Sequence, residues 1–171
     1  MKNIMIMLIS LLFLVTVVGC NNIDKNKTPE ASSTFSLPVT FDDGTKGEYL
    51  LIGEEGKVGF LVGSGKKGEA VEEKIIANKE SKYMWHFWGD KDRISGNFKV
   101  VGTDKEGKEH PVLVSGSDTV WQYANNSISP NNGADSHIPS NMLFPTSGLW
   151  KLDIYFNEKL FGKLVVNVTE N

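Results

Sequence analysis

Alternation of apolar and polar residues near the end of the chain limits the fold more than any other feature. One apolar face is formed by Trp150, Leu152, Ile154 and Phe156, with Lys151 and Asp153 between them. After a turn at Asn157-Glu158, a second apolar face is predicted for Leu160, Leu164, Val166 and Val168, with Gly162 indicating a bulge or a close backbone approach. A period of two places alternate side chains on opposite faces of a strand, so this segment is predicted to form a β-hairpin.

Earlier apolar segments are also bounded by turn residues. Residues 49–52 and 58–62 flank Glu54-Glu55-Gly56, and residues 98–101 and 111–114 bracket the polar segment 104–108, so two more hairpins are predicted. The segment YMWHFW at 83–88 is apolar on both faces, which is typical of a central strand that is covered on both sides. Short strands at this spacing, with little helix between them, predict an all-β antiparallel sandwich.

The start of the chain has the three-part layout of a secretory signal. A cationic head at Lys2 precedes an apolar run of roughly sixteen residues, whereas a membrane-spanning helix needs about 20. The motif Val17-Val18-Gly19-Cys20 resembles the bacterial lipobox, in which the cysteine thiol receives a diacylglycerol and the chain is cut before it. This resemblance implies that Cys20 begins the mature protein and anchors it to the cell membrane through fatty acyl chains.

Three segments are therefore expected: a signal peptide at 1–19, the lipidated Cys20 with a flexible linker at 20–34, and a β-sandwich domain at 35–171. The linker is too polar and too rich in small residues to bury much surface. Cys20 is the sole cysteine, so no internal disulfide is available and hydrophobic packing must stabilise the domain. Removing the signal and its one lysine changes the formal charge from -3 to -4, which argues against nucleic acid as a partner.

Residues 115–145 differ from the rest of the chain. Within them, residues 125–139 are so polar and so rich in turn formers that no regular element is predicted there. Long irregular loops in compact domains are uncommon and often functional, so a binding site is expected here first.

Two sequence stretches carry a second resemblance. Residues 131–168, NNGADSHIPSNMLFPTSGLWKLDIYFNEKLFGKLVVNV, together with HFWG at 86–89, resemble a family of uncharacterised lipoproteins from Gram-positive, spore-forming bacteria. The resemblance implies an immunoglobulin-like β-sandwich and a location at the cell envelope. It implies no catalytic residue, because the family carries no assigned activity.

Signatures of cofactor binding and catalysis are weak. Residues 63–68 match GxGxxG after a strand, but residues 69–78, which could be helical, have few apolar members and the chain lacks βαβ alternation. A flexible hairpin or inter-strand loop is the favoured interpretation. There is no GxSxG motif, the only thiol is predicted to carry lipid, and the 21 acidic residues are typical of a solvated surface. Neither an enzymatic activity nor a cofactor is expected.

Metal binding is the alternative function that we consider. Asp135 and His137 are two residues apart and would face one way in an extended chain, and Met142 adds a soft donor suited to copper. Capture or delivery of copper or zinc through these three residues is the alternative hypothesis, although a polar loop histidine is more often hydrogen-bonded or solvated. His86, between Trp85 and Phe87, is predicted to be a packed histidine with one satisfied nitrogen.

Aromatic residues suggest one further type of site. Trp150 and one of Trp85 and Trp88 are expected in the core, whereas Trp121 and Tyr123 lie beside the irregular segment and could stack on a carbohydrate. The competing interpretation is that this pair packs the loop onto the sandwich.

The sequence therefore favours a non-enzymatic binding or interaction module on the extracytoplasmic face of the cell membrane. Its partner is expected to be an envelope protein or a cell-wall ligand. Candidate contact residues are Trp121, Tyr123, Asn131, Asn132, Asp135 and His137.

Overall fold

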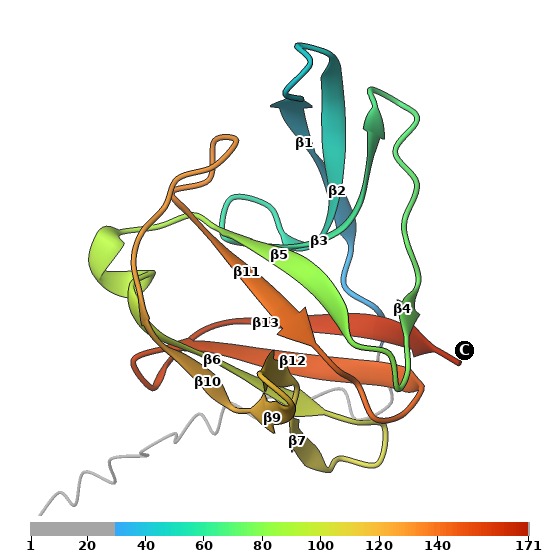
Figure 1. The fold of residues 1–171 in the computed structure, drawn as a ribbon, viewed down its shortest axis with the longest axis vertical. Coiled ribbons are helices and arrows are strands. Elements are labelled where there is room, and N and C mark those ends of the chain that lie inside the picture. The colour runs from blue at the N-terminus through green and yellow to red at the C-terminus, as the bar shows by residue number, and fades with distance from the viewer. Residues whose placement is uncertain (1–29, 171) are drawn as a thin grey trace, which may run out of the picture.

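The computed structural model describes residues 30–170, which form two β-sheets packed face to face (Figure 1). All strand pairs are antiparallel except β13 with β4, which confirms the predicted antiparallel β-sandwich. Within this range the only helical element is a 3₁₀ turn, η1 at Lys91–Arg93, and no helix is long and apolar enough to cross a lipid bilayer.

The seven-stranded sheet has the order β1-β2-β3-β5-β11-β8-β9. Its strands are β1 (Thr34–Thr40), β2 (Lys46–Glu54), β3 (Val58–Lys66), β5 (Ser81–Phe87), β11 (Ser136–Met142), β8 (Leu113–Ser115) and β9 (Asp118–Val120). The other sheet has the order β10-β6-β12-β13-β4, with β7 also paired to β6. Its strands are β10 (Gln122–Asn126), β6 (Gly96–Thr103), β12 (Gly148–Phe156), β13 (Lys159–Thr169), β4 (Ile75–Ile76) and β7 (Glu109–Pro111).

The three predicted hairpins are present. β2 pairs with β3 around Gly56, which has a positive φ of 74°, and β12 pairs with β13 after Asn157-Glu158. β6 pairs with β7 as predicted, but the hairpin ends at Pro111. After Val112 the chain crosses to the other sheet, where residues 113–115 form β8 beside β11.

A β-bulge changes the predicted inward face of β13. Ile154 lies opposite Gly162 and Tyr155 lies opposite Leu160, so Phe161 is the extra residue. Because one inserted residue reverses the alternation, Phe161 is buried and Leu160 is 47% exposed. The prediction that Leu160 shares the buried face was therefore wrong, whereas the bulge and the close approach at Gly162 are both present.

Residues 115–145 do not form one long loop, contrary to the sequence-based expectation. They contain β9, β10 and β11, and β11 lies inside the seven-stranded sheet between β5 and β8. Ser136 and Ser140 face the core alongside Ile138 and Met142, which makes the strand look polar in sequence. Residues 127–135 connect β10 to β11 and belong to no strand. Their β-structure is limited to one isolated bridge between Asn131 and Ala134.

The glycine-rich segment 63–68 serves as strand and turn. β3 continues to Lys66, and residues 69–78 contain the short strand β4 and no helix, so no strand–glycine loop–helix unit is formed. A Cβ atom on Gly63 would lie 2.2 Å from the Val71 carbonyl oxygen. Glycine is therefore required here for the close approach of two backbone segments.

The core lies between the two sheets. Its largest fully buried side chains include Trp85, Trp150 and Phe98, which confirms Trp150 and one of the two β5-region tryptophans as core residues. Trp85 Nε1 donates to Ser140 Oγ at 3.0 Å, and Trp150 Nε1 donates to the Thr146 carbonyl oxygen at 2.9 Å. Both buried indoles thus have hydrogen-bond acceptors.

The folded domain begins before the predicted boundary at residue 35. Ser32 donates its N–H to the Val165 carbonyl oxygen, and its hydroxyl accepts the Val165 N–H, both at 2.8 Å. The Ser33 carbonyl oxygen then accepts the Gly53 N–H. Residues 32–34 of the predicted linker are therefore attached to β13 and β2, and the chain enters the domain at that point. Cys20 and the predicted signal peptide lie outside the described residues.

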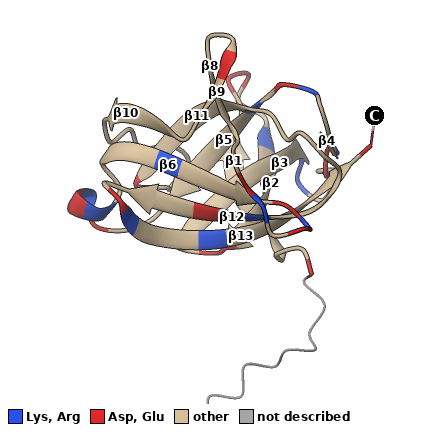
Figure 2. Cartoon of the chain, turned by 90° about the horizontal axis from the view of Figure 1, so that it is seen from below, with Lys and Arg blue, Asp and Glu red and all other residues tan. Residues whose placement is uncertain are grey.

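Charges of both signs alternate on the outer face of the six-stranded sheet (Figure 2). Asp153 on β12 lies 3.3 Å from the Lys151 ammonium and 3.8 Å from that of Lys163, and Lys99 pairs with Glu158 at 2.8 Å. Pairs whose lysine is open to solvent contribute little to stability, and they leave this face without a large field of one sign.

Candidate functional site

Four of the predicted contact residues gather at one end of β5 and β11. Asp135 accepts the Gly89 N–H at 2.9 Å, and Trp88 Nε1 donates to the Gly133 carbonyl oxygen at 2.8 Å. These two bonds hold the 127–135 connection against the end of β5. Asn131, Asn132, Asp135 and His137 therefore belong to one region of the surface.

His137 lies directly opposite His86 in the β5–β11 ladder. Opposite residues of antiparallel strands share a face of the sheet, with Cβ atoms about 4.5–5.5 Å apart. Trp85 points into the core, so His86 and His137 lie on the outer face of the seven-stranded sheet. We call these two residues the His86–His137 pair.

His86 is fully buried although it lies on the outer face. The Tyr49 ring covers it at a centroid distance of 6.0 Å and the Trp88 ring at 6.3 Å. Both ring nitrogens lack a hydrogen-bond partner, so the predicted satisfied nitrogen is not found. Burial, and secondarily the charge of His137, lowers the pKa of His86 to about 4. The imidazole is therefore neutral at pH 7.

His137 has one nitrogen engaged. Its Nδ1 and its backbone N–H both contact the Ser129 carbonyl oxygen. A carbonyl oxygen can only accept, so Nδ1 carries a hydrogen, and in the neutral imidazole the lone pair is then on Nε2. The His86–His137 pair therefore offers three ring nitrogens without a protein partner in the described chain.

A cavity of about 560 Å³ lies next to this pair, and we call it the tip cavity. It is lined by Thr40, Phe41, Asp42, Asp43, Tyr49, Asn131 and Asn132. The β1–β2 turn and the β10–β11 connection thus supply one cavity although they are far apart in sequence. The Tyr49 ring connects it to the His86–His137 pair, because it lies 6.3 Å from the Phe41 ring and 6.0 Å from that of His86.

The tip cavity combines aromatic rings with carboxylate and amide groups. Hydrogen bonds from the Thr45 backbone and side chain hold the pKa of Asp43 below its usual range, so this carboxylate stays ionised. Asn132, with a positive φ of 46°, donates its amide to Asn131 Oδ1. Polar groups that point toward a cavity can bind donors and acceptors of a ligand while the rings contact its apolar faces.

Trp121 and Tyr123 are not part of this region. Tyr123, on β10, donates its hydroxyl toward the Val114 and Asn141 carbonyl oxygens, at 2.8 and 3.1 Å, in the opposite sheet. Its hydroxyl therefore connects the two sheets, whereas the competing interpretation was that the pair packs the loop onto the sandwich. Trp121 is 41% exposed between β9 and β10 and remains a surface residue without an assigned role.

The predicted metal set is not assembled. His137 and Met142 are five residues apart on β11, which places them on opposite faces of the sheet, and Met142 is fully buried in the core. Asp135 is bonded to Gly89, and residues 30–170 contain no group of three His, Cys, Asp or Glu side chains arranged to hold a metal ion. Sequence reasoning left out His86, which lies beside His137, and Tyr49, whose ring covers His86.

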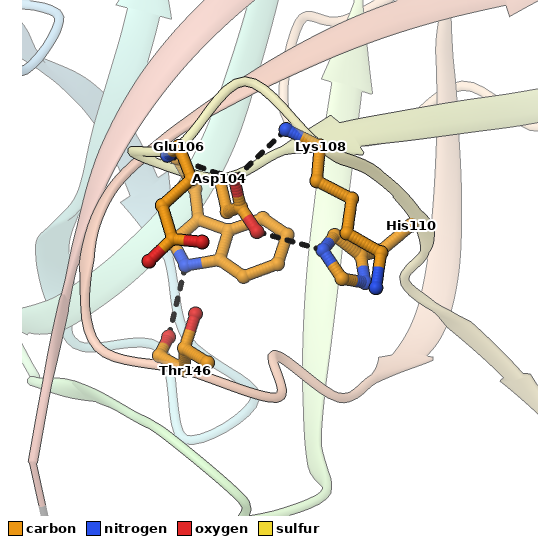
Figure 3. A network of polar contacts seen from close by, with 6 residues as sticks. Asp104, Glu106, Lys108, His110 and Thr146 are labelled. Atoms are coloured by element: carbon orange, nitrogen blue, oxygen red, sulfur yellow. Dashed lines mark hydrogen bonds and ion pairs between the residues drawn. The ribbon is translucent and has the colours of Figure 1, made fainter.

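A second polar cluster lies around the Asp104 turn (Figure 3). Asp104 Oδ1 accepts the N–H groups of Glu106 and Lys108 at 2.9 Å, and Oδ2 lies 2.8 Å from His110 Nε2. The His110 bond, followed by the backbone bonds, lowers the pKa of Asp104. The adjacent cavity measures about 660 Å³, but Asp104 and His110 are occupied with each other and with the turn. This cluster therefore stabilises the β6–β7 hairpin over Trp150 rather than offering free groups.

Comparison with known proteins gives a family and a fold. The sequence profile of the domain of unknown function DUF4871 matches residues 25–166. The chain is also similar to a crystal structure described as a "Putative Lipoprotein from Bacillus anthracis", with a TM-score of 0.59 and 23% identity over 86% of this chain and 91% of that one. At this identity the likeness concerns the fold. No curated protein matches in the sequence comparison.

Proposed function

Because the chain belongs to the DUF4871 family, whose description gives no function, we propose a function from its site and its sequence. The protein is a non-enzymatic binding module of the cell envelope, held on the outer face of the cell membrane by lipid on Cys20. It presents the tip cavity to a polysaccharide of the cell wall.

Membrane attachment is supported by two observations. The motif at residues 17–20 has the lipobox pattern, and the structural neighbour is itself described as a lipoprotein. The chain enters the domain at Ser32, twelve residues after Cys20, a separation that an extended chain spans with at most about 43 Å. The domain would therefore stay close to the lipid surface.

The position of the tip cavity supports a role in binding away from that surface. β1 begins next to Ser32 and ends at the turn that lines the cavity, so its seven residues carry the chain about 23 Å from the attachment point (Figure 1). The cavity thus lies at the opposite end of β1 from the tether. This arrangement suits a module that is anchored at one end and binds at the other.

The composition of the tip cavity is the single observation that supports a polysaccharide as the ligand. Phe41 and Tyr49 provide ring faces for the C–H surface of a sugar, whereas the carboxylates and amides match its hydroxyl groups, which both donate and accept.

Co-sedimentation with purified cell walls tests this function. We expect the full-length lipoprotein in detergent to sediment with the walls, and Asn131→Ala and Asp42→Ala each to lower the affinity for the walls about tenfold, as expected for one lost polar contact of about 1.4 kcal/mol. Asn167→Ala is the matched control, because Asn167 is exposed on β13, in the other sheet. Equal sedimentation of all four proteins, or of none, would rule the proposal out.

A further inference from the structure

The His86–His137 pair has a geometry that the tip cavity alone does not explain. The two imidazoles are directly opposite on β5 and β11 and share the outer face of the sheet. At a Cβ separation of about 4.5–5.5 Å, two imidazoles can reach a common ion at the usual nitrogen–metal distance of about 2.0–2.1 Å. The rings of Tyr49 and Trp88 cover His86, the more deeply buried member of the pair.

The hydrogen bonds of the pair leave ring nitrogens available to a metal. Both nitrogens of buried His86 lack a partner, and a buried polar group without a partner costs free energy, so it calls for an explanation such as a bound ion. His137 donates Nδ1–H to the Ser129 carbonyl oxygen, the kind of hydrogen bond that orients metal-ligating imidazoles and leaves Nε2 free.

We propose that His86 and His137 together bind one copper ion on the outer face of the seven-stranded sheet. This site is distinct from the predicted set of His137, Asp135 and Met142, because His86 takes the place of the two residues that the fold directs elsewhere. It does not depend on the polysaccharide proposed for the tip cavity.

Copper is selected by the number and type of ligands. Residues 30–170 offer no third His, Cys, Asp or Glu around this pair, whereas structural zinc sites use four protein ligands. Calcium and magnesium require several oxygen ligands, which the aromatic cover of His86 does not supply. Among divalent first-row metals, copper has the highest affinity for a given nitrogen site, so it retains useful affinity with two imidazoles and water.

Titration of the full-length lipoprotein in detergent with Cu(II) tests the proposal. Calorimetry is expected to give one equivalent of Cu(II), with Zn(II) at least tenfold weaker, and electron paramagnetic resonance of the Cu(II) form to show coupling to imidazole nitrogens. His137→Ala and His86→Phe are each expected to lower the affinity at least tenfold. His137 is only half-buried, so its variant should fold even if replacement of His86 perturbs the sheet.

His110→Ala is the matched control, because His110 is paired with Asp104 and lies on the β6–β7 hairpin of the other sheet. It should bind Cu(II) like the wild type. Absence of binding to the wild type would overturn the proposal. So would a tenfold loss in His110→Ala, or unchanged affinity and unchanged nitrogen coupling in folded His137→Ala.

Discussion

Lowering the pH from 7 to 4 is expected to reduce the free energy of unfolding of the metal-free protein by about 3 kcal/mol through His86 alone. In the folded state its pKa is lowered to about 4, whereas in the unfolded chain it is near 6.5. Between these two values the unfolded state binds the proton and the folded state does not. Stability is therefore greatest above pH 6.5 and is lost as the pH falls toward 4.

Replacement of His86 by phenylalanine isolates this effect. The ring has a similar shape and fits between Tyr49 and Trp88, but it cannot bind a proton. Protonation of carboxylates with lowered pKa values, such as Asp43 and Asp104, destabilises both proteins at still lower pH. Their contribution therefore cancels in the difference between the two proteins. Urea unfolding at pH 7, 6, 5 and 4 should show a steep decline only in the wild type. Parallel curves for the two proteins would mean that the folded protein accepts the proton on His86.

Gly53→Ala is expected to destabilise the protein by at least about 3 kcal/mol. Gly53 has a φ of 149°, and a Cβ atom there would lie 2.1 Å from the Val58 carbonyl oxygen and 3.1 Å from Leu164 Cδ2. Its N–H also donates to the Ser33 carbonyl oxygen. An alanine must therefore displace the β2–β3 hairpin from β13 and disturb the attachment of the N-terminal segment. Thermal or urea unfolding measures the loss.

Gly56→Ala, in the same hairpin, separates crowding from backbone strain. Gly56 also has a positive φ, 74°, but a Cβ atom there meets no heavy atom within 4 Å. Its replacement is expected to cost about 1 kcal/mol, which is the strain of the left-handed conformation alone. If both variants lost the same stability, the close contact between Gly53 and Val58 would be absent in solution.

Much of the fold could be predicted because local patterns are strong where one face of a strand is buried. The β12–β13 hairpin follows from its alternation, and the β2–β3 hairpin follows from the glycine of its turn. The sequence could not show that Leu160 faces solvent. A bulge exchanges the buried and exposed faces of the strand without any change in composition.

β11 escaped prediction for a different physical reason. Two of its four core-facing residues are serines, so the segment has no apolar alternation. Ser140 accepts the indole N–H of Trp85, a contact between residues 55 positions apart. A polar residue that is buried to satisfy a distant partner has the same appearance in sequence as a solvated one.

The candidate site could be predicted only in part. The polarity of residues 125–139 directed attention to Asn131, Asn132, Asp135 and His137, which the fold places at one end of β5 and β11. The sequence alone could not show that His137 faces His86, because this depends on the register between strands about 50 residues apart. The alternation within residues 85–88 was the one available signal, since it places His86 and Trp88 on the face opposite Trp85.

The mass of the native protein in the membrane fraction tests the central claim most directly, because the proposed function places the domain at the outer face of the cell membrane through Cys20. Intact-mass analysis of the cell-derived protein, followed by analysis of its N-terminal peptide, should find a chain that begins at Cys20 and carries the added mass of a diacylglycerol on the thiol. A chain that retains Met1 and has an unmodified thiol would contradict the account.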